Sequence, residues 1–363
     1  MLQLPPMNTG ANTPPTRIAC HMSHRLLLAI LLALPLFALG IPVTASAWEW
    51  VPSEEEIQKY RDSWNPFSHG PLLISSPDIQ PEGQWYVRPL IFSQIGSSNI
   101  GNKFGGAWDA KPGPVHLYSV QAPFIQMAYG LTNHLELVGQ TSLSAFWARQ
   151  NGQTTNDAGL GDSSIILKYR PIVQNPDTWQ PSVNWFNQIS LPTGRWADTD
   201  KVPGGFSPIG RFPSTRFGEI SLTTGFAFRK NREPYRWSGG IYYTHSTPGS
   251  QDGQTTYPGD LINTRLIFEH ILDDKHGFGY NLEFVTLHGL TARADGKPVN
   301  AGQKSGFSTI GVEPAVQWRF GDTNFAGAAG VLFTVAGQNS INAIYPNFSV
   351  FYYWSETGKV IMR

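Results

Sequence analysis

Ten charged side chains stand out in this 363-residue chain, because each occupies the opposite face of an extended segment from its apolar neighbours. Five are carboxylates and five are basic, so together they could form ion pairs or line a polar route for a solute. A ring of one sign, which would favour ion selectivity, is not among them. The spacing of these ten side chains does not decide between structural ion pairs inside the protein and a polar lining along which a solute passes. The ten are Glu136, Lys168, Arg170, Glu219, Arg229, Arg265, Glu269, Glu283, Glu313 and Arg319.

Histidine and serine residues give weaker signals for covalent or metal chemistry. His245 and Ser246 are adjacent, so on a strand they point to opposite faces and cannot share a proton. His288 has no carboxylate partner in the pattern, and the nine histidines show no ligand-like spacing. We therefore expect no enzymatic activity, no metal site and no cofactor. No nucleotide-binding loop appears either, so no energy source is implied.

Alternation with a period of two positions the charged groups. From Ile310 to Phe320 the even positions are apolar, or aromatic, while the odd positions carry Glu313, Arg319 and small or polar residues. The segment from 219 to 229 repeats this pattern. One face suits lipid and the other suits water, as in a transmembrane barrel. A soluble sandwich also alternates, but it gives no reason for long charged loops on alternate connections only.

The alternating segments and their connections predict the fold class. Short turns at 130–133, 231–234, 273–276 and 321–324 alternate with long loops at 95–114, 148–158, 193–214, 247–258 and 291–304. This predicts an all-β protein, a transmembrane antiparallel up-and-down β-barrel of about 12 strands over 83–356, with a tail at 357–363. The expected strands are 83–94, 115–129, 134–147, 159–172, 181–192, 215–229, 235–246, 259–272, 277–290, 305–320, 325–337 and 342–355.

The N-terminal region divides into two parts. An apolar run at 26–42 follows basic residues and precedes Ala45-Ser46-Ala47, which predicts a signal peptide over 1–47, with Met22 as an alternative start. Residues 48–82 are expected to be a periplasmic segment. There Ser53 and Glu56 form a capping-box pattern, which predicts a short helix. This segment is expected to plug the lumen or to lie beneath it; the alternative is a loosely ordered leader, since Pro66, Pro71, Pro77 and Pro81 interrupt regular structure.

Composition agrees with a wall that faces lipid. Charged residues make up 14% of the chain and aromatic residues 13%, and the net charge is zero, which gives no sign of a nucleic-acid partner. Aromatic residues near the ends of expected strands predict two girdles. These are Trp85, Tyr86, Tyr129, Trp147, Trp237, Trp318, Phe320 and the run 351–354. Apolar residues expected on the inner face favour a partly hydrophobic solute: Phe124, Phe186, Tyr242, Val285 and Leu287.

Two motifs are expected to meet at the external rim of the barrel. One is Gly159-Leu160-Gly161-Asp162, and the other is Ser190-Leu191-Pro192-Thr193-Gly194-Arg195. If residue 171 pairs with residue 182, Asp162 lies opposite Leu191. Asp162 is then placed to accept backbone N–H groups of the loop, with Arg195 as a candidate partner. A turn that merely shapes the rim is the alternative role.

Through these two motifs and the strand rhythm, the chain resembles the outer-membrane barrel family labelled MetA-pathway of phenol degradation. The resemblance covers the barrel from about residue 85 and implies passage of aromatic or other hydrophobic small molecules, without catalytic residues. We therefore expect a channel acting by facilitated diffusion in the outer membrane of a Gram-negative bacterium. Its expected partners are the lipid bilayer, the outer-membrane assembly machinery and a small hydrophobic or aromatic solute. The alternative is a non-conducting structural or surface-binding barrel.

Overall fold

The computed structural model describes residues 51–73, 77–150, 153–194, 219–251, 254–298 and 306–361, all within one compact unit, Trp50–Arg363. The expected signal peptide and Arg195 lie outside the described residues. None of the helices in the described ranges is both long enough and apolar enough to cross a membrane.

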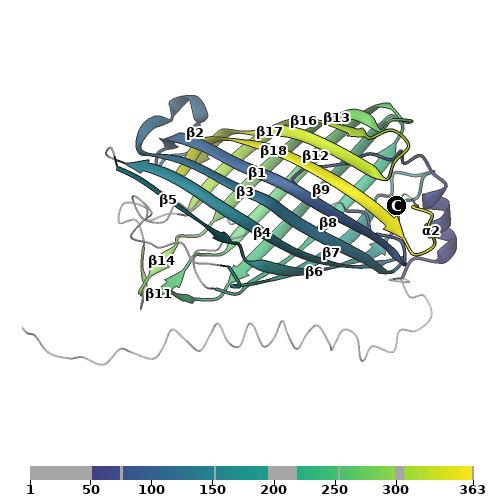
Figure 1. The fold of residues 1–363 in the computed structure, drawn as a ribbon, viewed down its shortest axis with the longest axis horizontal. Coiled ribbons are helices and arrows are strands. Elements are labelled where there is room, and N and C mark those ends of the chain that lie inside the picture. The colour runs from purple at the N-terminus through teal and green to yellow at the C-terminus, as the bar shows by residue number, and fades with distance from the viewer. Residues whose placement is uncertain are drawn as a thin grey trace, which may run out of the picture. The chain divides into compact units, whose positions relative to one another are not determined.

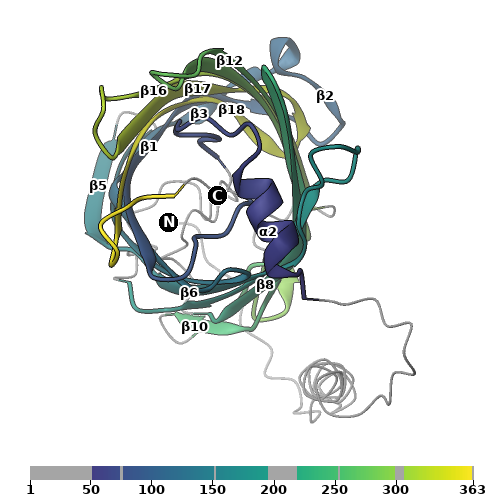
Figure 2. The same ribbon diagram turned by 90° about the vertical axis from the view of Figure 1, so that its right-hand side faces the viewer.

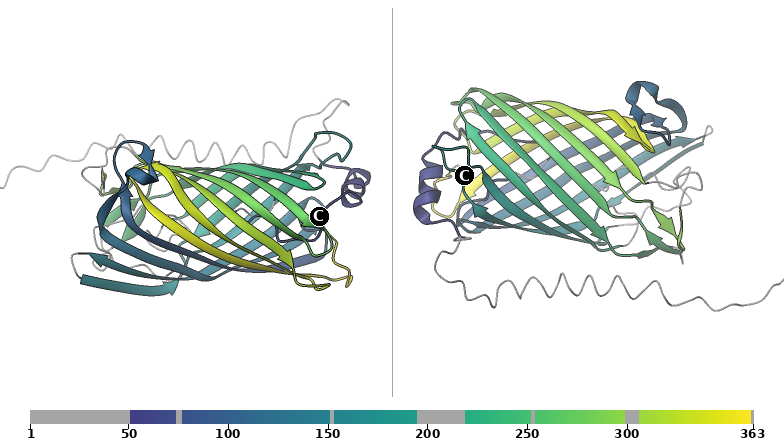
Figure 3. Two further views of the ribbon diagram at one scale, coloured as in Figure 1. Left: turned by 90° about the horizontal axis from the view of Figure 1, so that it is seen from above. Right: turned by 180° about the vertical axis from the view of Figure 1, so that it is seen from behind.

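Twelve antiparallel strands close into a barrel, which confirms the fold class expected from the alternation (Figures 1 and 3). Neighbours along the chain pair with each other, and the ring closes where the first strand pairs with the last, for example Tyr86 with Tyr353. The strands are β1 (Gln84–Ile100), β3 (Lys111–Thr132), β4 (Leu135–Gln150), β6 (Ser163–Ile172), β7 (Ser182–Leu191), β8 (Ser221–Arg232), β9 (Tyr235–Ser246), β12 (Leu261–Asp273), β13 (Phe278–Gly289), β16 (Phe307–Arg319), β17 (Phe325–Gln338) and β18 (Ser340–Ser355).

The loop end of the barrel, opposite the short turns, departs from the expected loops in two places. The segment at 148–158 is largely a hairpin, because β5 (Gln153–Leu160) pairs with the outer part of β4. The connection between β17 and β18 is a tight turn with Asn339 at a φ of 49°, so the short and long connections do not alternate strictly. The remaining short elements are β2 (Gly105–Gly106), η1 (Ala107–Asp109), β10 (Gly249–Gln251), β11 (Gln254–Tyr257), β14 (Arg293–Ala294) and β15 (Lys297–Pro298).

Apolar and polar side chains separate onto the two faces of the wall. On β16, Val316 is exposed on the outer face, while Glu313 and Gln317 are fully buried inside. On β8, Phe226 is exposed and Arg229 is buried. Water would solvate such outward apolar side chains poorly, so the outer face suits the hydrocarbon of a bilayer.

The aromatic residues at the turn end occupy both faces, so the expected girdle is only partly correct. Trp85 packs outside against Tyr129 at 4.2 Å between ring centroids. Tyr86, Phe351 and Tyr353 are each 2% exposed and point inward. Adjacent strand residues must face opposite sides, so a run of aromatic residues cannot all lie at the lipid headgroup level.

The helix α2 (Glu54–Arg61) lies at the turn end of the barrel (Figure 2). Its capping box is present, since the Ser53 hydroxyl accepts the Glu56 N–H and the Glu56 carboxylate accepts the Ser53 N–H. Ile57 and Tyr60 are buried and pack with Val173 of the turn after β6. The predicted helix is therefore confirmed, and it is docked on the barrel.

Candidate functional site

After α2 the chain runs inside the ring of strands and occupies the lumen near its turn end (Figure 2). We call residues 65–73 and 77–82 the plug. Its first arm is 66–73 and its second arm is 77–82. The plug side chains buried to 4% exposure or less are Ser68, His69, Leu72, Asp78, Ile79 and Gln80.

Wall side chains bind the backbone of the first arm. The Gly70 N–H donates to Gln317 Oε1 at 2.6 Å, and Asn281 Nδ2 donates to the Gly70 carbonyl at 3.0 Å. The N–H groups of Leu72 and Leu73 donate to the two carboxylate oxygens of Glu283, at 2.6 and 3.1 Å. Because these contacts satisfy buried backbone groups, they offset the cost of enclosing an irregular segment.

The first arm also packs against aromatic residues of β18, the strand that pairs with β1 to close the barrel. The Phe67 ring meets Tyr353 edge to face at 5.3 Å, and the His69 ring lies 4.7 Å from Phe351. Arg88 places its guanidinium 4.9 Å from the centroid of the same Phe351 ring and donates to the Leu72 carbonyl at 2.5 Å. One side of the arm is thus apolar, whereas the other is hydrogen-bonded.

The second arm is held by a buried ion pair. Lys168 Nζ lies 2.5 Å from Glu136 Oε1, with side-chain exposures of 1% and 0%. Each partner also binds the arm: Glu136 Oε2 accepts the Gln80 N–H at 2.7 Å, and Lys168 donates to the Asp78 carbonyl at 3.1 Å. The pair therefore joins β4, β6 and the plug.

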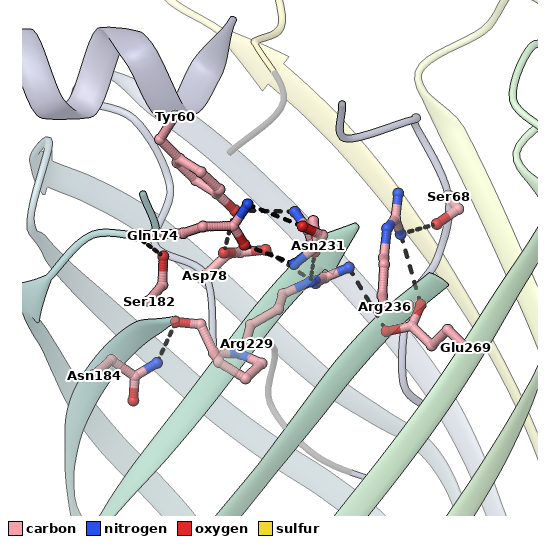
Figure 4. Close-up of polar contacts among 12 residues, drawn as sticks. Tyr60, Ser68, Asp78, Gln174, Ser182, Asn184, Arg229, Asn231, Arg236 and Glu269 are labelled. Atoms are coloured by element: carbon pink, nitrogen blue, oxygen red, sulfur yellow. Dashed lines mark hydrogen bonds and ion pairs between the residues drawn. The ribbon is translucent and has the colours of Figure 1, made fainter. Parts of the chain in front are cut away.

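The plug's one buried carboxylate enters an arginine network (Figure 4). Arg229 Nη1 lies 2.9 Å from Asp78 Oδ2, and the Tyr60 hydroxyl donates to Asp78 Oδ1 at 2.7 Å. Glu269 lies 3.6 Å from both Arg229 and Arg236, so it bridges the two guanidinium groups. Burial raises the pKa of Tyr60, and the charge on Asp78 raises it further, so the hydroxyl stays protonated.

Nine of the ten charged residues singled out in the sequence are at most 8% exposed. Six of them lie in the contacts described above or beside them: Glu136, Lys168, Arg229, Glu269, Glu283 and Glu313, the last being the cross-strand neighbour of Glu283. Three lie elsewhere: Arg170 at Tyr60 near the turn end, Arg265 at Asn263 in the interior, and Glu219 just before β8 at the loop end. Arg319 is half-buried and stacks over Phe67.

Sequence reasoning missed three members of the site. Arg236 lies between the outward residues Tyr235 and Trp237, and Arg88 lies between the outward residues Val87 and Pro89, so the period of two could have assigned both to the inner face. Asp78 lies in an irregular, proline-containing stretch, and no periodic signal marks it.

Towards the loop end, the inner faces of β6 to β9 carry mainly hydroxyl and aromatic side chains. Hydroxyl pairs cross neighbouring strands there: Thr223–Thr244 at 2.8 Å, Ser221–Ser246 at 3.0 Å and Ser164–Ser190 at 2.8 Å. Between these hydroxyls and the plug, Phe186 and Tyr242 meet edge to face at 5.2 Å. Val285 is also buried inside and Leu287 is half-buried, whereas the Phe124 side chain lies outside the described part.

The two rim motifs do meet. The Gly194 N–H donates to Asp162 Oδ1 at 3.0 Å, and a Cβ on Gly194 would stand 2.7 Å from the Leu160 carbonyl oxygen. Ser163, not Asp162, pairs with Leu191, so the expected register is wrong by one residue. The ladder begins with Ile172 opposite Val183 instead of residue 171 opposite residue 182, and a bulge between Tyr169 and Ile172 takes back one of the two positions. Burial raises the pKa of Asp162 to about 6, against the hydrogen bond from Gly194. Gly159 lies in β5, Gly161 beside Asp162, and Pro192 just after β7.

Two histidines have partners that the sequence did not indicate. His245 Nδ1 lies 2.9 Å from Asp260 Oδ1, and Asp260 also accepts the hydroxyls of Tyr243 and Tyr257. His288 Nδ1 lies 2.6 Å from the Ser308 hydroxyl across the β13–β16 ladder. Within the described ranges no three His, Cys, Asp or Glu residues gather as a metal site would require.

No protein-family model matches the chain, and no curated protein matches it. Among solved structures, the COG4313 outer membrane channel from Pseudomonas putida F1 has a TM-score of 0.61 and 13% identity, covering 77% of this chain and 100% of that one. The chain therefore has the fold of an outer-membrane channel. The resemblance to the phenol-degradation family remains a prediction from the two motifs.

Two more distant likenesses support no inference. The translocator domain of the autotransporter NalP from Neisseria meningitidis has a TM-score of 0.42 and 12% identity, covering 74% of this chain and 88% of that one. The CymD monoaromatic hydrocarbon channel has a TM-score of 0.38 and 9% identity, covering 76% and 90%.

Proposed function

We propose that the protein is an outer-membrane channel that passes small hydrophobic or aromatic molecules by facilitated diffusion. The observation that carries this proposal is the inner face of β6 to β9 towards the loop end, where cross-strand hydroxyl pairs lead to the Phe186–Tyr242 aromatic pair. We place the protein in the outer membrane of a Gram-negative bacterium, reached with a cleaved signal peptide and the outer-membrane assembly machinery.

The lining favours neutral over charged solutes on physical grounds. Hydroxyl groups that are already paired with each other offer little compensation to an ion that leaves water, whereas aromatic edges and faces contact an apolar ring favourably. Further in, Lys168 is paired with Glu136 and Arg229 with Asp78, so these groups offer no field of one sign to attract a counter-charge. A neutral aromatic such as phenol fits this chemistry.

A non-conducting structural or surface-binding barrel is the second candidate, and the plug favours it. Both plug arms are bound by buried groups of the wall, so the lumen near the turn end is occupied by the protein itself. This candidate and the channel differ in one measurable property, which is conductance.

The test is conductance of the purified, refolded barrel in a planar lipid bilayer at pH 7.5 and at pH 5.5, with and without phenol. Stepwise conductance that phenol partly blocks, at one pH or at both, is the expected result. Phe186→Ala should weaken the block, and the matched control Phe284→Ala should leave it unchanged, because Phe284 is 43% exposed on the outer face. Silence from a folded barrel, together with equal uptake of aromatic solutes by cells with and without it, would favour the structural candidate.

A further inference from the structure

The His69 imidazole is buried, and one of its two ring nitrogens has no hydrogen-bond partner among the described residues. It is 4% exposed in the first arm of the plug, and its ring lies on Phe351. Its Nδ1 is 3.0 Å from the Gly70 carbonyl oxygen, which can only accept, so Nδ1 carries the proton and Nε2 holds the lone pair. Nε2 has no hydrogen-bond partner among the described residues. A second proton on this ring would therefore be buried without an acceptor.

The charged groups on the surrounding elements do not favour a cationic His69. On β1, Arg88 lies over the same Phe351 ring and repels a second positive charge. On β13, both oxygens of Glu283 already accept plug N–H groups. On β12, Glu269 accepts from Gln317 of β16 and bridges Arg229 of β8 and Arg236 of β9.

The remaining neighbours add one more cation. Arg319 of β16 stacks over Phe67, two residues before His69, while β18 presents the neutral rings of Phe351 and Tyr353. Glu313 of β16, the cross-strand neighbour of Glu283, accepts the Asn347 side-chain amide through Oε1, and its Oε2 has no hydrogen-bond partner among the described residues. None of these three carboxylates, Glu269, Glu283 and Glu313, hydrogen-bonds to His69 Nε2.

We propose that protonation of His69 releases the first arm of the plug from the barrel wall, so that the lumen is held closed at neutral pH and loosened in mild acid. The release of the arm does not depend on the proposed function; only its consequence, the passage of a solute, rests on the protein being a channel.

The sign follows from proton linkage. Burial, followed by the charge on Arg88, holds the pKa of His69 well below its usual range in the bound arm. A released arm would titrate near the ordinary value of about 6.5, so the released form binds more protons below that pH. Closure is therefore complete above about pH 6.5 and weakens as the pH falls. Between pH 7.5 and 5.5 the released fraction should rise about tenfold.

A buried cysteine in the arm can report its release. Leu72 is 1% exposed and packs on Ala315 and Ala328, so a cysteine at this position is covered while the arm is bound. The labelling rate of the Leu72→Cys variant by a membrane-impermeant maleimide is measured on the barrel in lipid vesicles. Cys20, the sequence's one cysteine, lies in the expected signal peptide. At each pH the rate is divided by that of Asp322→Cys, an exposed turn position, which removes the intrinsic pH dependence of the thiol. Ser68→Cys is the second reporter if Leu72→Cys does not fold.

His69→Phe is the decisive variant, because it keeps a ring on Phe351 and cannot take a proton. His276→Gln is the matched control, since His276 is an exposed turn residue bound to Asp273. We expect the labelling ratio to rise about tenfold from pH 7.5 to 5.5 in the parent and in His276→Gln, and to stay flat in His69→Phe. A flat ratio in the parent, or an equal rise in His69→Phe, would overturn the proposal.

Conductance recorded on the same proteins separates this inference from the proposed function. Labelling that rises in acid without any phenol-sensitive conductance would uphold the switch and reject the solute channel. Phenol-sensitive conductance with labelling that stays flat would do the reverse.

Discussion

The buried pair Glu136–Lys168 makes a quantitative prediction about what holds the second arm. Replacing Lys168 by Met leaves the Glu136 carboxylate fully buried, with the Gln80 N–H as its remaining described hydrogen-bond donor. Removing one member of a buried ion pair costs about 3 to 5 kcal/mol, because the other charge stays desolvated without compensation. Lys168→Met should therefore lower the free energy of unfolding by that amount, and Glu136→Gln should do nearly the same.

The double variant tests the reasoning. Glu136→Gln with Lys168→Met removes both charges, so its loss should be well below the sum of the two single losses. The free energies are measured by urea unfolding of the barrel in lipid vesicles, with Asp322→Asn as a surface control. If the loss of unfolding free energy in the double variant equals the sum of the two single losses, or if each single loss is below about 0.5 kcal/mol, Glu136 and Lys168 do not stabilise each other as a buried ion pair.

Three further predictions follow from the rim and the wall. Because the pKa of Asp162 is raised to about 6, the folded state binds more protons than the unfolded chain, so stability should fall as the pH rises from about 4 to 6, and Asp162→Asn should abolish that slope in unfolding titrations. Gly130→Ala would place a Cβ 2.0 Å from the Pro81 carbonyl oxygen and should lower the unfolding free energy by about 1 to 3 kcal/mol, whereas Gly139→Ala, with nothing within 4 Å, should change it little. Asp260→Ala should speed hydrogen exchange in β11, which the Tyr257–Asp260 contact helps to fix, and exchange in β7 should not change.

The strands could be found from sequence because each wall residue faces one of two very different surroundings. Phe226 lies towards lipid and Arg229 towards the interior, and β16 shows the same contrast between Val316 and Glu313. Where residue type was used without its position in the alternation, the inference failed. Tyr86 and Tyr353 were grouped with outward aromatic residues although their positions in the alternation place them inside.

The plug contacts could not be predicted, because they join residues far apart in the chain. Leu72 and Glu283 are 211 positions apart, and the contact uses the backbone of Leu72, which carries no sequence signal. The register of β6 on β7 is a similar case, since nothing in the alternation marks its first pair, Ile172 with Val183, or the bulge after Tyr169.

The seam between β1 and β18 has a consequence for how the molecule is made. The plug directly precedes β1, and the inner face of β18 packs on Phe67 and His69 of that plug. The ring cannot close until the last strand has been synthesised, and when it closes it must do so around a segment from the opposite end of the chain. If the first arm already lies against the other strands, β18 can pack on Phe67 and His69 as it pairs with β1. The N-terminal segment would then take part in barrel assembly as well as occupy the finished lumen.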